Sequence, residues 1–198
     1  MNGPDFDRAR QYILTRLERE LSPNLFYHGV RHTRNDVLPA VEQLSLLAGI
    51  EGEELLLLRT ATLYHDAGYI EQYFHNEPIG VRMARETLPD FGYSPGQLEV
   101  ISGIIMATHP PQAPQTYLQQ IMCDADLDSL GRVDFFLISH ALRLELMAYG
   151  TPTTVRQWYE GQLDFLTAHT YFTAEAKTLR DPGKRQNIEE IRKLLGAC

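Results

Sequence analysis

Residues 51–68 read EGEELLLLRTATLYHDAG, an apolar stretch that ends on a neighbouring histidine and aspartate. Leucine, alanine and threonine lie on most sides of this segment, so the sequence predicts a helix buried at the centre of the fold. Gly68 is a natural stop, which places His65 and Asp66 in the last helical turn. Adjacent helical residues point about 100° apart. The two side chains can therefore share a partner only at the helix end, where the geometry loosens.

Helical periodicity recurs along almost the whole chain, with recognisable caps. Ser94 and Gln97 have capping-box spacing, Gly49 has the position of a C-cap, and Thr151 and Asp181 are predicted N-caps. We expect further helices over residues 4–22, 32–49, 76–88, 94–109, 114–131, 132–150, 151–172 and 181–196. No run of β alternation, glycine-rich phosphate loop or repeat is evident. The sequence predicts an all-α fold, a multi-helix bundle of roughly nine or ten helices.

Composition narrows the class of protein. The chain has 198 residues, which fits a single domain over residues 1–198. A net charge of -8 argues against a general nucleic-acid surface. Cys123 and Cys198 give no disulfide framework, the first ten residues do not resemble a signal peptide, and no apolar run approaches the ~20 residues that span a bilayer. We expect a cytoplasmic protein without membrane association.

Histidine and aspartate residues gather near the predicted helix ends. Five of the seven histidines lie in the first 110 residues, and three aspartates crowd the segment CDADLD. They are His28, His32, His65, His75 and His109, with Asp124, Asp126 and Asp128. Each has a simpler explanation when taken alone, because a histidine favours a helix C-terminus and a carboxylate run favours a solvated turn.

The combined pattern favours a metal site. A buried carboxylate is costly unless it is paired, and no lysine or arginine follows Asp66 within four residues. A divalent cation would pair it, and imidazole with carboxylate suits Mn, Fe, Zn, Ni or Mg. The residues alone leave all three aspartates of CDADLD open as ligands.

The order His32, His65-Asp66, Asp126 resembles the H…HD…D signature of the HD-domain metal-dependent phosphohydrolases. The resemblance runs from about Tyr27 to Glu145 and includes the segments YHGVRHT, HDAGY with NEPIG, DADLDSLGR and RLE. Within these segments the chain is similar to a branch of predicted HD phosphohydrolases. It departs from that branch at residue 29, where glycine replaces asparagine, and at residues 79–80, where Ile-Gly replaces Ser-Ala.

The resemblance implies a set of roles. The ligands of a first divalent metal would be His32, His65, Asp66 and Asp126. Asp66 would bridge to a second ion if one binds, with His75 and His109 as further ligands or phosphate contacts. His28 and His109 are candidate proton donors, and candidate phosphate contacts are Arg31, Arg132 and Arg143, for which an intramolecular ion pair is the alternative. The HD core would span about residues 22–150, flanked by helices over 1–21 and 151–198.

These expectations lead to one principal function and two alternatives. The principal one is metal-dependent hydrolysis of a small phosphate ester, such as a nucleotide monoester or diester, with one or two ions. The first alternative is a di-iron oxygenase of the HD type, since the chain offers six residues in the order H…HD…H…H…D. The second is a non-catalytic ligand-binding module. The substrate, the metal and the oligomeric state stay open, a homodimer being one option.

Overall fold

Helix α3 (Gly52–Tyr64) is the central helix that the sequence predicts, and it packs against α1, α2, α4 and α5. The computed structural model describes residues 3–196. Leu58, Ala61, Leu63 and Tyr64 of α3 have no exposed surface, which explains why the segment is apolar on most sides.

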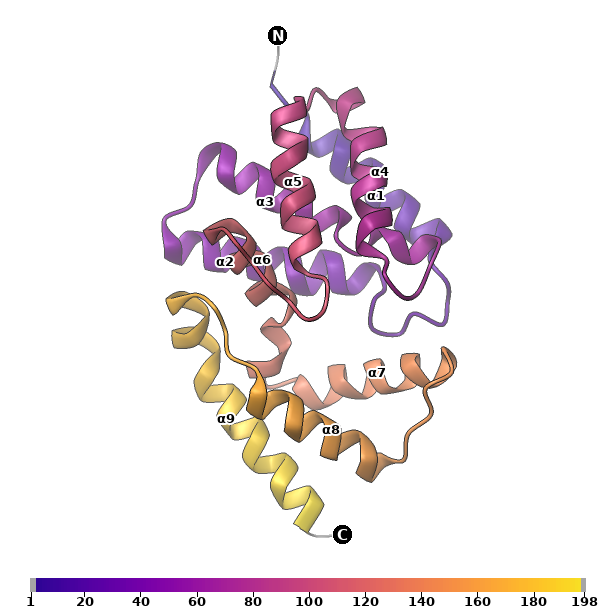
Figure 1. Ribbon diagram of the computed structural model, residues 1–198, viewed down its shortest axis with the longest axis vertical. Coiled ribbons are helices and arrows are strands. Elements are labelled where there is room, and N and C mark those ends of the chain that lie inside the picture. The colour runs from indigo at the N-terminus through magenta and orange to yellow at the C-terminus, as the bar shows by residue number, and fades with distance from the viewer. Residues whose placement is uncertain (1–2, 197–198) are drawn as a thin grey trace.

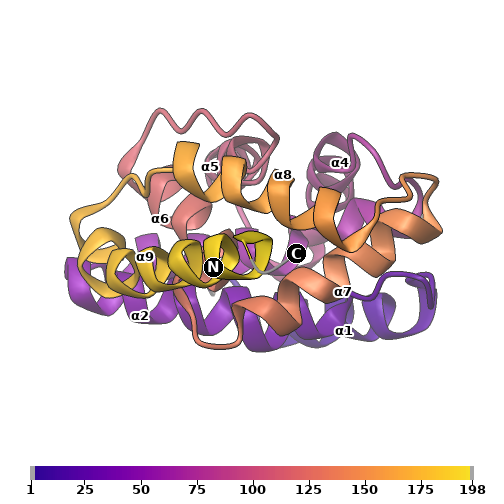
Figure 2. The ribbon, with the colours of Figure 1, turned by 90° about the horizontal axis from the view of Figure 1, so that it is seen from below.

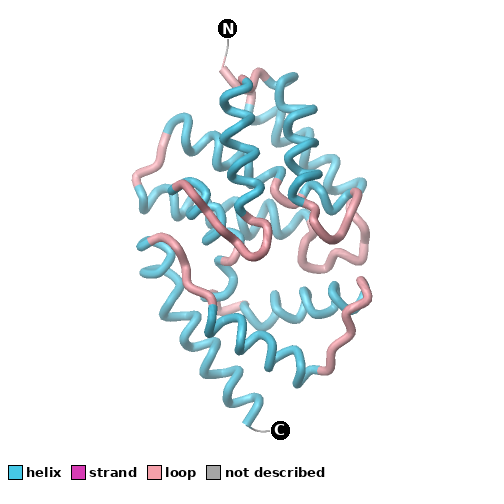
Figure 3. The backbone as a smooth tube through the Cα atoms, in the orientation of Figure 1, coloured by secondary structure: helices cyan, strands magenta, loops and turns pink. Residues whose placement is uncertain are grey.

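Nine α-helices and four short helical turns make up the described residues. In chain order they are α1 (Phe6–Glu20), the π-helix η1 (His32–Val37), α2 (Leu38–Ala48), α3 (Gly52–Tyr64), η2 (Ala67–Ile70), α4 (Glu77–Thr87), η3 (Leu88–Phe91), α5 (Pro95–Ala107), α6 (Tyr117–Asp126), η4 (Asp128–Gly131), α7 (Phe135–Ala148), α8 (Val155–Ala168) and α9 (Ala174–Gly196). Residues 3–196 contain no strand (Figure 3). The predicted all-α class and helix number are confirmed.

The helices form two groups that meet at the middle of the molecule (Figure 1). Helices α1 to α6 lie in one half, and α7, α8 and α9 lie in the other. Viewed from below, α8 and α9 run beside each other and α7 lies alongside (Figure 2). Gly131 and Gly183 bring η4 and α9 into backbone contact, since a Cβ atom at residue 183 would lie 2.0 Å from the Gly131 carbonyl oxygen.

Two predicted N-caps are wrong. Helix α8 begins at Val155 rather than near Thr151, because Thr154 and Gln157 form a reciprocal capping box. The last helix does not begin at Asp181, because α9 runs unbroken from Ala174 to Gly196 with Pro182 inside it.

The helix predicted over residues 32–49 begins as a π-helix. Its first six residues, His32–Val37, form η1, and α2 continues from there to Gly49, which has a positive φ of 69°. The predicted capping box of Ser94 and Gln97 and the Gly49 cap are confirmed. Among residues 3–196, no helix has the length and apolar character needed to cross a bilayer.

Candidate metal centre

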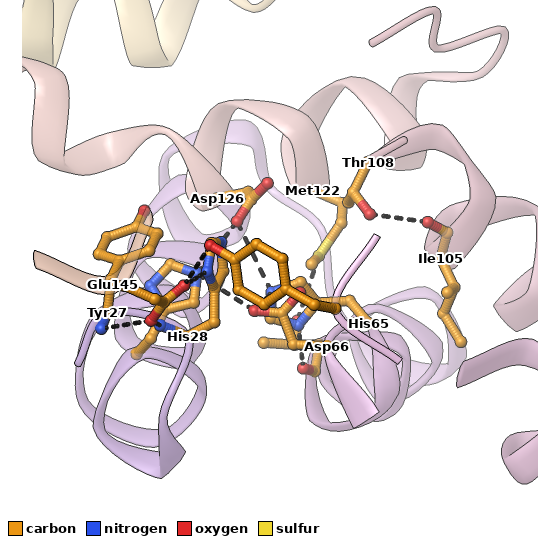
Figure 4. Close-up of polar contacts among 12 residues, drawn as sticks. Tyr27, His28, His65, Asp66, Ile105, Thr108, Met122, Asp126 and Glu145 are labelled. Carbon is orange, nitrogen blue, oxygen red and sulfur yellow. Dashed lines mark hydrogen bonds and ion pairs between the residues drawn. The ribbon is translucent and has the colours of Figure 1, made fainter. Parts of the chain in front are cut away.

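Four side chains from the ends of different helices converge at one point. His32 is the first residue of η1, His65 and Asp66 lie in the turn between α3 and η2, and Asp126 is the last residue of α6. Figure 4 shows His65, Asp66 and Asp126 pointing toward one another, with His28 and Glu145 beside them. A π-helical turn such as η1 is frequent at functional sites.

The distances between these atoms suit a shared cation. Asp126 Oδ1 lies 3.2 Å from His32 Nε2 and 3.6 Å from His65 Nε2. Asp66 Oδ2 lies 3.2 Å from His65 Nε2 and 3.6 Å from His32 Nε2. One ligand atom from each of His32, His65 and Asp66 lies within 4.8 Å of the others. Two imidazoles and two carboxylates form a donor set that accepts Zn, Mn or Fe.

The orientation of His65 leaves one ring nitrogen directed at the centre. Its Nδ1 lies 2.7 Å from the carbonyl oxygen of Thr62, so Nδ1 carries the proton and donates it to that oxygen. The opposite nitrogen, Nε2, is then the one that faces Asp66 and Asp126, just as a metal-binding histidine directs one nitrogen to the ion and donates from the other. Within the described residues, His65 Nε2 and Asp66 Oδ2 are buried atoms without a hydrogen-bond partner. A buried polar atom without a partner destabilises the fold, and a bound cation would be a partner for both atoms.

The imidazoles and carboxylates of the cluster shift one another's pKa values. Burial lowers the pKa of His65, but the neighbouring carboxylates of Asp66 and Asp126 outweigh it and hold that pKa well above its ordinary value. Burial raises the pKa of Asp126, but the neighbouring imidazoles of His32 and His65 outweigh it and lower that pKa below its ordinary value. The pKa of Asp66 is lowered for the same reason, since His65 outweighs its burial. The two carboxylates are therefore ionised and ready to bind a cation.

The three aspartates of CDADLD have three different environments. Asp124 accepts hydrogen bonds from the backbone of Phe172 and Thr173, each at 2.8 Å, and so anchors the start of α9. Asp128 accepts a 2.5 Å hydrogen bond from Arg180 Nε. Asp126 lies at the imidazoles and also accepts a 3.3 Å bond from Gln112 Nε2. The structure thus places Asp126 alone of the three in the cluster.

His28 lies beside the cluster and is held by Glu145 of α7. Its Nδ1 is 2.5 Å from Glu145 Oε1, and its ring stacks on Tyr69 with centroids 4.5 Å apart. Glu145 is fully buried and also accepts hydrogen bonds from the backbone N–H groups of Tyr27 and His28 and from the hydroxyl of Tyr73. Burial lowers the pKa of His28, but the Glu145 hydrogen bond outweighs it and raises that pKa above its ordinary value.

His75 and His109 form a second pair of imidazoles. Their ring centroids are 5.5 Å apart, and His109 Nδ1 lies 3.0 Å from Glu77 Oε2. His75 has a φ of 57°, a left-handed conformation that is uncommon outside glycine. The structure brings these two histidines together, but they are not part of the group formed by His32, His65 and Asp66. Their role as second-metal ligands stays a prediction.

The three candidate arginines have other contacts in the structure. Arg132 donates to Asp134 through Nε and Nη2 and to Asp36 through Nη1, at 2.6–2.9 Å. Arg143 donates to the carbonyl oxygen of Thr153. Arg31 is exposed and near enough to Asp134 to lower its pKa, although Arg132 is the larger cause. Substrate binding by these residues stays a prediction.

A cavity of about 510 Å³ opens beside the cluster, lined by His28 and Asp126 at one side and by residues of α7 and α8 at the other. It places the candidate metal ligands at the wall of a space large enough for a small organic ligand, roughly 300–1,000 Å³.

Sequence reasoning did not assign roles to Glu145, Glu77 and Gln112. Glu145 was visible only as the last residue of the RLE segment, and its contact with His28 spans 117 positions of the chain. Glu77 and Gln112 carry no local signal that separates them from ordinary surface residues.

Comparison with known proteins gives one match. Residues 37–129 match a family model described as HD domain. That range contains His65, Asp66 and Asp126, whereas His28 and His32 precede it. Neither the search of curated proteins nor the search of solved structures found a match.

Proposed function

We propose that this chain, of which residues 37–129 match the HD-domain family model, is a metal-dependent hydrolase of a small phosphate ester, with nucleotide monoesters and diesters among its candidate substrates. The observation that carries the proposal is the convergence of two imidazoles and two carboxylates on one point. Two buried atoms of this cluster, His65 Nε2 and Asp66 Oδ2, have no other partner among the described residues. The cluster also forms part of the wall of a ligand-sized cavity.

The residues that would hold the ion are His32, His65, Asp66 and Asp126. When bound, a divalent ion such as Mn, Mg, Fe, Ni or Zn supplies Lewis-acid chemistry, which makes water nucleophilic near neutral pH and offsets the charge of a phosphoryl group. Thr62 keeps the His65 ring in the orientation that this requires. Gln112 holds the second oxygen of Asp126.

His28 is the proposed proton donor. In the reaction the oxygen of water bonds to phosphorus, the bond from phosphorus to the ester oxygen breaks, and the ester oxygen takes up a proton to leave as an alcohol. Glu145 engages Nδ1 of His28, which leaves Nε2 as the nitrogen that can deliver that proton. His109 is a second candidate, since Glu77 engages its Nδ1 in the same manner.

Phosphate release tests the proposal directly. Purified protein is incubated with nucleotides, phosphodiesters and sugar phosphates, each with Mn, Mg, Ni, Fe and Zn in turn. We expect hydrolysis of at least one class with at least one metal. The variant Asp66→Asn should lower kcat at least about 100-fold, because a neutral amide cannot replace an ionised ligand, and should sharply lower the metal content of the protein.

Asp90→Asn is the matched control, since Asp90 is an exposed aspartate on η3. It should keep the activity and metal content of the natural chain. Unchanged turnover and metal content in Asp66→Asn would contradict the proposal.

The same preparations separate the oxygenase alternative. The observation that favours it is the neighbouring pair His75 and His109, which could supply ligands to a second ion. Two tightly held irons per chain together with oxygen uptake would support that alternative. Metal-stimulated phosphate release without oxygen uptake would exclude it. A non-catalytic module would show neither activity.

A further inference from the structure

The cavity beside the cluster has predominantly apolar walls. It lies between the end of α6 with η4, the segment after α5, and helices α7 and α8. The apolar side chains that line it include Leu127, Leu130, Phe135, Ile138, Phe165 and Phe172. Phe165 is 45% exposed, so part of this wall faces water although it is aromatic. A bound apolar group would cover that surface, a gain of roughly 25 cal/mol per Å².

The cavity lacks the cations that a polyphosphate needs. Within residues 3–196 no lysine or arginine lines it. The cations in its vicinity have other partners: Arg132 pairs with Asp36 and Asp134, and Lys184 donates to the carbonyl oxygen of His169. Each phosphate placed in an apolar cavity without a cation would carry a large desolvation cost.

The wall also carries polar side chains, and some of them are engaged in hydrogen bonds. Ser139 Oγ accepts a 2.9 Å hydrogen bond from Trp158 Nε1 and lies 3.3 Å from Gln162 Oε1. Thr108 donates to the carbonyl oxygen of Ile105. These contacts occupy the hydroxyl groups of Ser139 and Thr108.

We propose that the substrate carries a single phosphoryl group on a bulky apolar alcohol, with the phosphoryl group at the metal cluster and the apolar group in this cavity. The inference rests on the proposed function and narrows it to one substrate class. His28 and Asp126 border both the cluster and the cavity, so one molecule can occupy the two at once. A nucleoside polyphosphate would place its further phosphates against walls that carry no lysine or arginine among the described residues.

A series of non-hydrolysable n-alkylphosphonates tests this binding mode. Methyl-, butyl-, hexyl- and octylphosphonate are titrated into the Mn-supplied protein by calorimetry. We expect the dissociation constant to fall by roughly three- to fourfold for each added methylene until the cavity is filled. The alkyl phosphates of the same lengths, whose leaving alcohols have similar acidity, should show a parallel rise in kcat/KM.

Two adjacent substitutions on α8 provide the structural control. Ala168 is exposed and lines the cavity, whereas its exposed neighbour Thr167 lines a separate groove beside α9. Ala168→Trp should lower the ratio of octyl- to methylphosphonate affinity at least tenfold, because the indole occupies the space of the alkyl chain. Thr167→Trp places the same side chain one residue away and should keep the ratio of the natural chain.

The outcomes separate this inference from the function on which it rests. Chain-length-dependent binding without any hydrolysis would retain the apolar cavity and reject the proposed hydrolase. Hydrolysis with a flat response to chain length, or tighter binding of a nucleoside triphosphate than of octylphosphonate, would reject the apolar substrate. An equal loss in Ala168→Trp and Thr167→Trp would also reject it.

Discussion

Glu145 is the residue whose environment is most unusual. Its carboxylate is fully buried without a lysine or arginine, and it accepts from two backbone N–H groups, the Tyr73 hydroxyl and His28. Burial raises its pKa, but the His28 hydrogen bond outweighs this and lowers the pKa below its ordinary value. Helix α7 is thus tied to the segment that carries His28, so Glu145 is a positioning residue for the proposed proton donor.

Substitution Glu145→Gln tests this positioning role. Glutamine keeps the size of the side chain but puts an NH₂ group where one oxygen accepts, so the His28 ring loses its anchor. We expect kcat to fall about 10- to 100-fold, since proton donation contributes about 10²–10⁴. The free energy of unfolding should fall by about 1–3 kcal/mol. The bound metal per chain should stay constant, which distinguishes this variant from Asp66→Asn.

Tyr73→Phe serves as its control, because it removes only one of the donors to Glu145 and leaves His28 in place. Its kcat should stay within about threefold of the natural chain. Loss of metal in Glu145→Gln would place Glu145 in the metal cluster instead and contradict the positioning role.

At the residue scale, the sequence predicted the candidate metal ligands better than the residues that hold those ligands in place. His65 and Asp66 were evident because a buried carboxylate after an apolar helix needs a partner. Composition and spacing could not choose among Asp124, Asp126 and Asp128, because Asp124 meets the segment just before α9 and Asp128 meets Arg180 of α9. Contacts over some fifty positions leave no local periodicity.

At the element scale, the close approach of α4 to α3 positions the His65-Asp66 turn. A Cβ atom added at Gly80 of α4 would lie 2.6 Å from the Tyr64 carbonyl oxygen and 3.3 Å from that of His65. The first distance is shorter than any real Cβ contact, and its partner is backbone. Gly80 therefore permits the close approach of α4 to the end of α3.

Substitution Gly80→Ala should push α4 away from this turn. We expect the free energy of unfolding to fall by about 1–3 kcal/mol, which is the usual cost of overpacking. We also expect metal affinity to weaken, because the added Cβ would press on Tyr64, which directly precedes the ligands His65 and Asp66. Chemical denaturation and metal titration measure the two effects. Gly96→Ala on α5 is the matched control, since a Cβ there meets nothing within 4 Å, and it should be neutral or slightly stabilising. Equal stability of the two variants would contradict the close-approach explanation.

Element boundaries were predictable where caps are local and not where tertiary contacts act. The Ser94 capping box and the Gly49 cap were evident from the sequence and are confirmed. The start of α9 was missed because it depends on Asp124, fifty positions earlier, which accepts from the backbone of the two residues just before the helix. The π-helix η1 was missed because its periodicity differs little from that of an α-helix over six residues.

At the scale of the whole molecule, the all-α class and the HD-domain resemblance were predictable and are confirmed. Both rest on patterns that persist over many residues. The cavity was not predictable, because α7 and α8 supply one wall and the segments near α5 and α6 supply the other. No chemical role was evident for α8 from the sequence, and α7 reaches the site beside η4, against which it packs.

Global stability should depend on pH through His169, which follows α8 and contacts α9. Burial lowers the pKa of His169 to about 4, with Lys184 adding to the effect and Asp181 opposing it. An unfolded chain protonates a histidine near pH 6.5. Between pH 6.5 and 4 the unfolded state therefore binds more protons than the folded state, so the contribution of His169 is fully present above pH 6.5 and is lost as the pH falls.

Relative to His169→Gln, the natural chain should lose about 1–2 kcal/mol of unfolding free energy between pH 7 and pH 5, measured by denaturant titration. His140→Gln, at an exposed histidine of α7, should keep the pH dependence of the natural chain, and an equal slope in all three proteins would show that His169 protonates freely in the fold.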